Sequence, residues 1–149
     1  MGARSVTNIK YLDAADLHEW IKKGHTSLGQ AFQVIDVRGS DYIGGHILGC
    51  WNYPYKKLSG DDATMEELRD RILSISRNHE DVIVNVVFHC AQSQQRGPSA
   101  AMKFLRALQD KDLQTVKVWI LRGGFNHWQD VYGEDDEVTE GYEPALWGW

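Results

Sequence analysis

Hydrophobic residues along the chain fall into short continuous runs and into longer stretches with helical spacing. Mostly apolar runs at residues 32–37, 82–88 and 116–121 predict buried strands. The run at 82–88 is apolar at every position but one, which is typical of a central strand in a parallel sheet covered on both faces. A β-branched segment at residues 6–12 predicts a further short strand.

Helices are predicted between and after these strands. Apolar residues recur at helical spacing in 14–22, in 63–77, in a segment that opens at Pro98, and in 125–131. Pro98 is placed at the start of its helix because proline is favoured in the first turn. Strands that alternate with helices in this way indicate an α/β domain with a mostly parallel sheet and right-handed crossovers.

The length and charge of the chain limit its organisation and its partners. Its 149 residues fit one domain over 1–149, which ends in a short acidic and aromatic tail from residue 133. The acidic part of this tail is expected to be solvated and its tryptophans to pack on the domain. The net charge of −5 argues against a nucleic-acid partner, and no apolar run of about 18 residues suggests a membrane span. The expected assembly is a monomer or a weak dimer.

Cysteine and histidine usage adds information on compartment and cofactors. Cys50 and Cys90 are too few for a disulfide framework and indicate a reducing compartment, the cytoplasm or the nucleus. Cys50 is interpreted as a structural thiol, with a resolving thiol as the alternative. The six histidines are scattered and no Cys-x-x-Cys or His-Glu-x-x-His spacing occurs, so no metal and no bound cofactor are expected.

The strongest indication of chemistry follows the most apolar strand. Cys90 comes just after Phe88, and the next predicted helix opens at Pro98. Ligands of open α/β sheets bind beyond the carboxyl ends of strands, and a helix N-terminus offers unpaired N–H groups to an anion. A thiol in such a place is stabilised as the thiolate, so Cys90 is predicted to be a nucleophile. The alternative is an inert packing cysteine.

The spacing between Cys90 and Arg96 makes this prediction more specific. Five residues separate the two, and a loop of this size can aim its N–H groups at a tetrahedral oxyanion while Arg96 binds two of the oxygens. Attack by sulfur on phosphorus would give a cysteinyl-phosphate, which water would hydrolyse. The predicted catalytic residues are Cys90 and Arg96, and the predicted substrate-binding residues are Ala91, Gln92, Ser93, Gln94, Gln95, Arg96 and Gly97.

Several neighbouring residues are predicted to support this loop. His89 is expected to orient the loop through a hydrogen bond to a loop carbonyl, with a role as a base as the alternative. Ser93 either stabilises the thiolate through its hydroxyl or serves as a turn residue. Asp36 and Arg38 are expected to hold a turn and the active-site loop rather than to react.

The loop resembles a known signature. The motif consists of His89, Cys90, Arg96, Gly97 and Pro98. It resembles the signature of the cell-division-cycle dual-specificity phosphatases, also called M-phase inducer phosphatases. It is also similar to the signature of the related eukaryotic arsenate reductases. Two further segments resemble signatures of the rhodanese-like superfamily. The first signature is matched by Ile35-Asp36-Val37-Arg38 with Tyr42, Gly45-His46-Ile47 and Asn52. The closing signature is matched by Leu121-Arg122-Gly123-Gly124-Phe125 with Trp128. The resemblance implies a rhodanese-like fold with a five-stranded parallel sheet, with Cys90 as nucleophile and Arg96 as oxyanion binder.

The chain departs from the phosphatase signature at two positions. Those phosphatases carry an acidic residue just before the arginine, where this chain has Gln95, so the loop supplies no general acid. Aryl phosphates, whose leaving group needs that acid least, are therefore the favoured substrates. The phosphatases also carry a protective second cysteine in the first signature, and the matching position here is Val37.

These features favour a cysteine-dependent phosphatase that hydrolyses phosphate monoesters of tyrosine or aryl type. The first alternative is an arsenate reductase, which would use glutathione or glutaredoxin as its reductant. The second is a rhodanese-like binding module without turnover. Sulfurtransferases of the superfamily usually carry a loop one residue shorter, so that activity is placed below phosphatase and arsenate reductase. The expected partner is a phosphate- or arsenate-bearing substrate.

Overall fold

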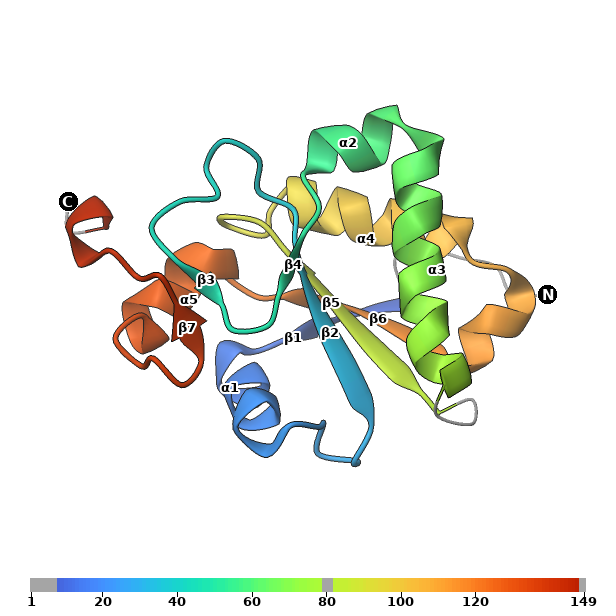
Figure 1. The fold of residues 1–149 in the computed structure, drawn as a ribbon, viewed down its shortest axis with the longest axis horizontal. Coiled ribbons are helices and arrows are strands. Elements are labelled where there is room, and N and C mark those ends of the chain that lie inside the picture. The colour runs from blue at the N-terminus through green and yellow to red at the C-terminus, as the bar shows by residue number, and fades with distance from the viewer. Residues whose placement is uncertain (1–7, 79–81, 148–149) are drawn as a thin grey trace.

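The computed structural model of the protein describes residues 8–78 and 82–147. The strands in these ranges are β1 (Ile9–Leu12), β2 (Ala31–Asp36), β3 (His46–Ile47), β4 (Trp51–Asn52), β5 (Val84–His89), β6 (Val116–Leu121) and β7 (Thr139–Glu140). The helices are α1 (Ala14–Lys23), α2 (Tyr55–Gly60), α3 (Asp62–Asn78), α4 (Arg96–Ala107) and α5 (Gly124–Tyr132), with short 3₁₀ helices at Asp110–Gln114 and Pro144–Leu146. Figure 1 shows the long strands at the centre of the molecule and the helices around them.

Five parallel strands form the main sheet, in the order β1-β6-β5-β2-β4. All six residues of β5, the middle strand, are buried. A strand with helices over both faces needs apolar side chains on both sides, which explains the nearly continuous apolar run in this segment. The predicted five-stranded parallel sheet flanked by helices is confirmed.

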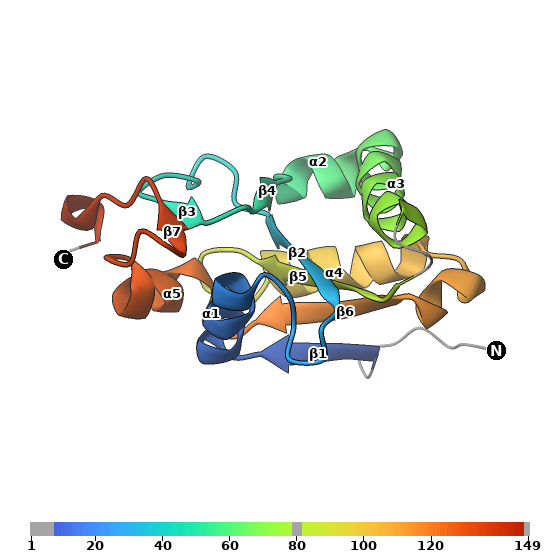
Figure 2. The same ribbon diagram turned by 60° about the horizontal axis from the view of Figure 1, so that its bottom comes forward.

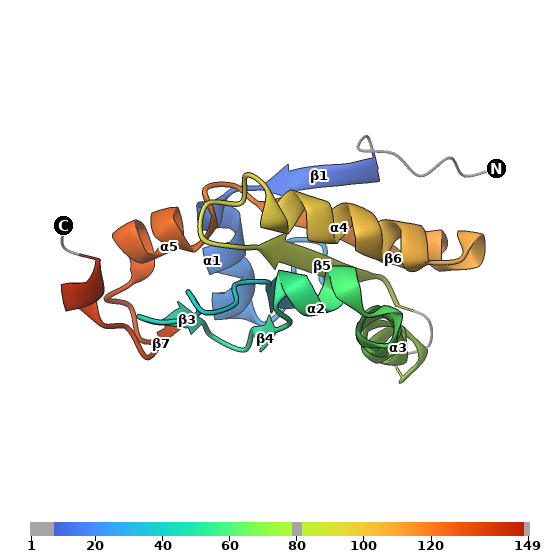
Figure 3. The same ribbon diagram turned by 90° about the horizontal axis from the view of Figure 1, so that it is seen from above.

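Helices cover both faces of this sheet (Figures 2 and 3). The larger apolar cluster joins one face to α2, α3 and α4, through residues such as Leu68, Ile72 and Phe104. The smaller cluster joins the other face to α1 and α5, through Leu17 and Trp128 among others. Both layers are anchored by fully buried side chains, so the carboxyl ends of the strands are held in fixed positions relative to the helix ends.

One predicted helix begins earlier than expected. Helix α4 starts at Arg96 rather than at Pro98, so the loop that follows Cys90 ends at Arg96, in the first helical turn. Pro98 still lies in the first turn, where its missing N–H costs no hydrogen bond. A Cβ placed on Gly97 would lie only 3.4–3.5 Å from backbone atoms of His89 and Cys90. The absence of a side chain at Gly97 therefore lets the helix begin directly beside β5.

The segments between the long elements were not predicted. The two-residue strands β3, β4 and β7 and the short helix α2 have too few residues to show a hydrophobic period. Residues 6 and 7 of the first predicted strand lie outside the described residues, and β1 is observed from Ile9.

The C-terminal segment combines exposed acidic residues with parts that pack on the domain. Glu134, Asp136 and Glu137 are exposed, as expected for the acidic run. Strand β7 pairs with β3 in a separate antiparallel ribbon, and Val138 is fully buried. Within the acidic run, the carboxylate of Asp135 lies 3.3 Å from the ring of His18 and 3.4 Å from the ammonium of Lys22. The expected packing of a tryptophan is seen for Trp147, whose indole N–H donates to the carbonyl of Gly44 over 2.9 Å.

Candidate active site

The loop that carries Cys90 connects β5 to α4 at the carboxyl edge of the sheet, where it curves between the two elements in Figures 1 and 3. It surrounds a cavity of about 430 Å³. The lining comes almost entirely from the predicted site: Cys90, Ala91, Gln92, Gln94, Gln95 and Arg96. A single short segment therefore supplies the thiol, the guanidinium and the surrounding backbone.

Two backbone N–H groups converge on the thiol of Cys90, one from the loop and one from the first turn of α4. The backbone N–H of Ser93 donates to its Sγ over 3.1 Å, and that of Gly97 over 3.4 Å. Cys90 is only 3% exposed, so its sulfur is largely shielded from solvent. Several N–H groups aimed at one atom form the arrangement that holds an anion in proteins.

Ser93 acts through its backbone rather than through its hydroxyl. Its φ of 57° lies in the left-handed region, which turns its N–H toward the sulfur of Cys90. The hydroxyl is buried and has no hydrogen-bond partner among the described residues. Of the two expectations for Ser93, the turn residue is the one that the geometry fits.

The N-terminus of α5 holds the outer side of the loop. The backbone N–H of Phe125 donates to the carbonyl of Cys90 over 3.0 Å, and that of Asn126 donates to the carbonyl of Ala91 over 2.8 Å. A Cβ placed on Gly124 would lie 2.5 Å from the carbonyl oxygen of Ala91, which explains the glycine there. Because these two carbonyls point toward α5, the loop's N–H groups are free to point toward the cavity.

His89 also contacts the loop, and it is fully buried. Its Nδ1 lies 3.0 Å from the carbonyl oxygen of Cys90. Burial lowers the pKa of His89, and this effect outweighs the opposing carboxylate of Asp36, which lies 3.7 Å from Nε2. The charge of this carboxylate is also paired with Arg38. A neutral His89 fits the expected role of orienting the loop.

Asp36 and Arg38 form a buried ion pair beneath the site. The guanidinium donates to the carboxylate from Nε over 3.0 and 3.1 Å and from Nη2 over 2.7 Å, and both side chains are fully buried. Nη2 also donates to the carbonyl of Gly45 over 2.8 Å, and the guanidinium lies 4.3 Å from the ring of Phe125. This pair joins β2, the following turn and α5, as a structural role requires.

Arg96 is engaged by a residue that sequence reasoning missed. Its Nη1 and Nη2 donate to the two carboxylate oxygens of Asp41 over 2.8 and 2.6 Å. Hydrogen bonds from Arg96 lower the pKa of Asp41 to about 2. Asp41 and, to a smaller extent, Cys90 raise the pKa of Arg96. Arg96 and Cys90 line the same cavity. Asp41 stands 55 positions before Arg96, and only its place in the first signature turn could have suggested the contact.

Cys50 is a free thiol in a different environment from Cys90. Its Sγ lies 3.9 Å from the hydroxyl of Tyr42, and it packs against the smaller apolar cluster. Burial raises the pKa of Cys50 to about 12. A thiol that holds its proton so strongly is a poor nucleophile, which fits the structural interpretation better than the resolving one.

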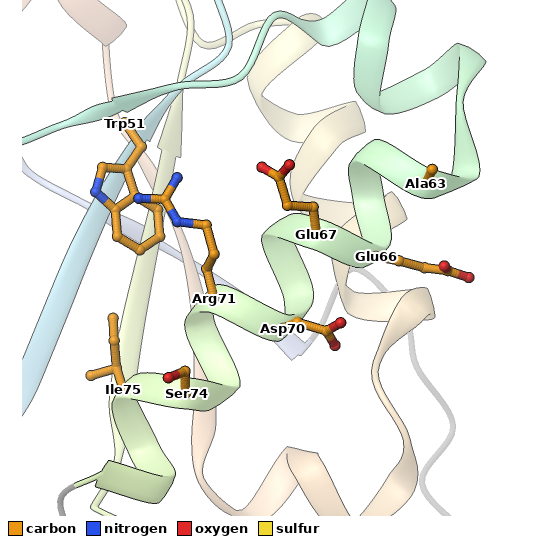
Figure 4. Close-up of a pocket in the computed structure, with 8 residues that line it drawn as sticks. All are labelled: Trp51, Ala63, Glu66, Glu67, Asp70, Arg71, Ser74 and Ile75. Atoms are coloured by element: carbon orange, nitrogen blue, oxygen red, sulfur yellow. The ribbon is translucent and has the colours of Figure 1, made fainter.

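Metal sites, membrane-spanning helices and further grooves would be other indications of function in the described residues. No group of three or more His, Cys, Asp or Glu side chains that could hold a metal is found in residues 8–78 and 82–147. None of the helices in these ranges has the combined length and hydrophobicity that a bilayer-spanning segment needs. A groove of about 680 Å³ runs along α3, where Arg71 stacks 3.6 Å above the ring of Trp51 (Figure 4). No residue of the Cys90 loop lines this groove.

Comparison with known proteins agrees with this geometry. The sequence matches the family described as Rhodanese-like domain over residues 13–131. The protein of Saccharomyces cerevisiae named CDC25-like phosphatase YCH1 is 51% identical over 148 residues, which cover 99% of each chain. Arsenical-resistance protein 2 of the same yeast is 35% identical over 100 residues, or 66% of this chain and 74% of that protein.

A solved structure is similar over nearly the whole chain. The crystal structure of Saccharomyces cerevisiae Ygr203w is described as a homolog of single-domain rhodanese and the Cdc25 phosphatase catalytic domain. It matches with a TM-score of 0.92 and 51% identity, and the match covers 99% of this chain and 97% of that one. On the family match and on these similarities, the chain belongs to the rhodanese-like family.

Proposed function

We propose that the protein is a cysteine-dependent phosphatase that hydrolyses phosphate monoesters, with aryl and tyrosine-type esters as its substrates. One observation carries the proposal: the backbone N–H groups of Ser93 and Gly97 point at the thiol of Cys90, and Arg96 lines the same cavity. A cavity of this kind is matched to a tetrahedral oxyanion bound at the sulfur. The phosphatase names of the similar proteins support the same conclusion.

The reaction begins with attack by the thiolate of Cys90 on phosphorus. The S–P bond forms as the ester P–O bond breaks, and the electron pair of the P–O bond leaves with the aryl oxide. The loop N–H groups and Arg96 stabilise the charge on the three equatorial oxygens. Water then attacks phosphorus, the S–P bond breaks, and phosphate and the thiolate are released.

The choice of aryl esters follows from the absence of a carboxylate in the loop. Residues 91–95 are uncharged, so no loop side chain can protonate the leaving oxygen. An aryl oxide departs as a comparatively stable anion and needs this proton least. Alkyl esters of serine or threonine, whose alkoxide is much more basic, are expected to react slowly.

Arsenate reduction is the second candidate, and the similarity to Arsenical-resistance protein 2 favours it. The thiolate of Cys90 would displace hydroxide from arsenate. The sulfur of glutathione would then attack Sγ and break the S–As bond, which leaves an electron pair on arsenic as arsenite and a mixed disulfide at Cys90. Glutaredoxin with a further thiol would reduce that disulfide.

Parallel assays of the purified full chain and of Cys90→Ser test the proposal. The substrates are 4-nitrophenyl phosphate, arsenate with glutathione and glutaredoxin, and thiosulfate with cyanide. Phosphate release that is abolished in Cys90→Ser supports the phosphatase. Arsenite formation without phosphate release would overturn it in favour of the reductase. Transfer of sulfur to cyanide alone, or no turnover of any substrate, would refute both.

A further inference from the structure

The contact between Asp41 and Arg96 connects two distant parts of the sequence at the mouth of the site. Asp41 lies in the turn between β2 and β3, and Arg96 begins α4. The carboxylate is held in place by its own turn, because the backbone N–H of Gly39 donates to Oδ1 over 3.0 Å. Nη1 of Arg38 lies 3.4 Å from the backbone carbonyl of Asp41. Asp41 is therefore supported by the buried Asp36–Arg38 pair.

The geometry of the contact determines which part of Arg96 remains for a ligand. A guanidinium carries five N–H donors in a planar fork, on Nε, Nη1 and Nη2. Asp41 accepts from Nη1 and Nη2, so it lies against the far end of the guanidinium. The N–H of Nε and the second N–H of Nη2 remain available on another edge of the guanidinium. These two donors are parallel, so this edge can also bind two oxygens at once.

We propose that Asp41 is a positioning residue for oxyanion binding: it holds the terminal edge of Arg96 so that the Nε–Nη2 edge is presented to an oxyanion at Cys90. The proposal rests on the proposed function and deepens it. Arg96 is about one-third exposed, and without a partner its long side chain would sample many rotamers. A guanidinium that is already oriented loses less entropy when the oxyanion binds.

The same contact argues against Asp41 as the proton donor that the loop lacks. Hydrogen bonds from Arg96 lower the pKa of Asp41 to about 2, so near neutral pH it carries no proton to give. Asp41 is therefore not the general acid of the reaction. The contribution of Asp41 is expected to be independent of the leaving group.

The test uses Asp41→Asn, which keeps the shape of the side chain and removes its charge. Its matched control is Asp70→Asn, which removes the carboxylate of an exposed contact with Arg69 on α3, outside the Cys90 loop. Two quantities are measured in each protein. The first is the protection of Cys90 by tungstate against alkylation with iodoacetate, which gives the oxyanion affinity without turnover. The second is the pair kcat and KM for aryl phosphates whose leaving groups differ in basicity.

We expect Asp41→Asn to weaken tungstate protection and to raise KM by about three- to tenfold, the effect of losing one half-exposed charged contact. The loss should be the same for good and poor leaving groups, and Asp70→Asn should behave as wild type. Asp41→Glu, which keeps the carboxylate, should recover part of the affinity. A thermal unfolding midpoint near that of wild type shows that the variant is folded.

Three results would overturn the proposal. A loss confined to poor leaving groups would make Asp41 a proton donor. Tighter tungstate protection in Asp41→Asn would mean that the carboxylate competes with the oxyanion for Arg96. Unchanged protection and KM would leave Asp41 without a role in binding. If wild type proves to have no phosphatase activity, the protection experiment still decides the role of Asp41, so the two failures are distinguishable.

Discussion

Nδ1 of His89 lies 3.0 Å from the carbonyl oxygen of Cys90, the next residue in the chain. Because a carbonyl oxygen can only accept a hydrogen bond, the ring proton of His89 is assigned to Nδ1. The same carbonyl accepts the backbone N–H of Phe125 over 3.0 Å. Two donors from opposite sides of the loop thus fix the peptide that follows the nucleophile.

This contact predicts different outcomes for two replacements of His89. The amide of Asn can donate from nearly the position of Nδ1, whereas the longer Gln places its amide near the position of Nε2. We expect His89→Asn to keep most of the kcat/KM for 4-nitrophenyl phosphate and His89→Gln to lose about tenfold, since a buried carbonyl loses a hydrogen bond. Equal activity in the two variants would show that the Nδ1 contact does not shape the loop.

Burial of His89 also predicts a dependence of stability on pH. The pKa of His89 in the folded chain is lowered below its ordinary value of 6.5. Below pH 6.5 the unfolded chain therefore binds a proton that the folded chain does not, so the free energy of unfolding falls as pH falls. The slope from this residue is at most about 1.4 kcal/mol per pH unit.

Urea denaturation between pH 7.5 and pH 5 measures this slope. His89→Asn removes the titrating group, so its free energy of unfolding should change less over this range than that of wild type. The same slope in both proteins would mean that His89 is not the group responsible.

The buried pair of Asp36 and Arg38 predicts a large loss of stability when one partner is removed. Arg38→Met leaves the carboxylate of Asp36 buried without its counter-ion, which should cost about 3–5 kcal/mol. The control is Arg122→Met, which breaks an exposed contact of 2.9 Å with Asp13 and should cost under about 1 kcal/mol. Chemical denaturation of both variants gives the comparison, and similar losses in the two would contradict a special role for the buried pair.

The long elements of this fold could be predicted from sequence because their hydrophobic patterns are long enough to recognise. The apolar run at 82–88 indicated the central strand, observed as β5, and the run at 116–121 coincides with β6. Strands β3 and β7 have two residues each and exist only because they pair with one another across 92 or more positions. No local pattern encodes such a pairing, so the sequence predicted the packing of the C-terminal tryptophans but not the ribbon formed by β3 and β7.

The candidate site shows the same division between local and distant information. The loop from Cys90 to Arg96 is contiguous, so its spacing carried the prediction, and the structure brings those residues together around one cavity. Asp41 was missed because its partner Arg96 is 55 positions away and a single Asp in a turn is common. The start of α4 at Arg96 depends on the close approach of Gly97 to His89 and Cys90. This tertiary contact leaves no local pattern in the sequence.

The environment of Cys50 predicts its behaviour toward alkylating and oxidising reagents. Because burial raises its pKa to about 12, almost no thiolate of Cys50 exists near neutral pH. We expect iodoacetate at pH 7 to label Cys90 and to leave Cys50 unlabelled, as measured by peptide mass spectrometry. Cys50→Ser should retain wild-type turnover. A disulfide between Cys50 and Cys90 after mild treatment with peroxide would contradict the structural interpretation and make Cys50 a resolving thiol.

The contact between Gly124 and the active-site loop predicts the effect of one added methyl group. Gly124 has a φ of 59°, and a Cβ there would lie 2.5 Å from the carbonyl oxygen of Ala91 and 2.6 Å from that of Cys90. Those carbonyls are backbone atoms of the loop, so they must move to admit Gly124→Ala. Gly49 has a comparable φ of 78°, and nothing lies within 4 Å of a Cβ placed on it. Gly49→Ala therefore measures the cost of the left-handed backbone conformation without a steric clash.

We expect Gly49→Ala to lower the free energy of unfolding by about 1–2 kcal/mol and to leave kcat/KM unchanged. Gly124→Ala should cost about 2–5 kcal/mol, because the steric clash adds to the strain, and should lower kcat/KM by about 100-fold, since a shift of about 1 Å misplaces the N–H groups around Cys90. Denaturation and initial rates on 4-nitrophenyl phosphate measure both effects. A Gly124→Ala variant that loses stability but keeps its activity would show that α5 supports the fold without positioning the loop.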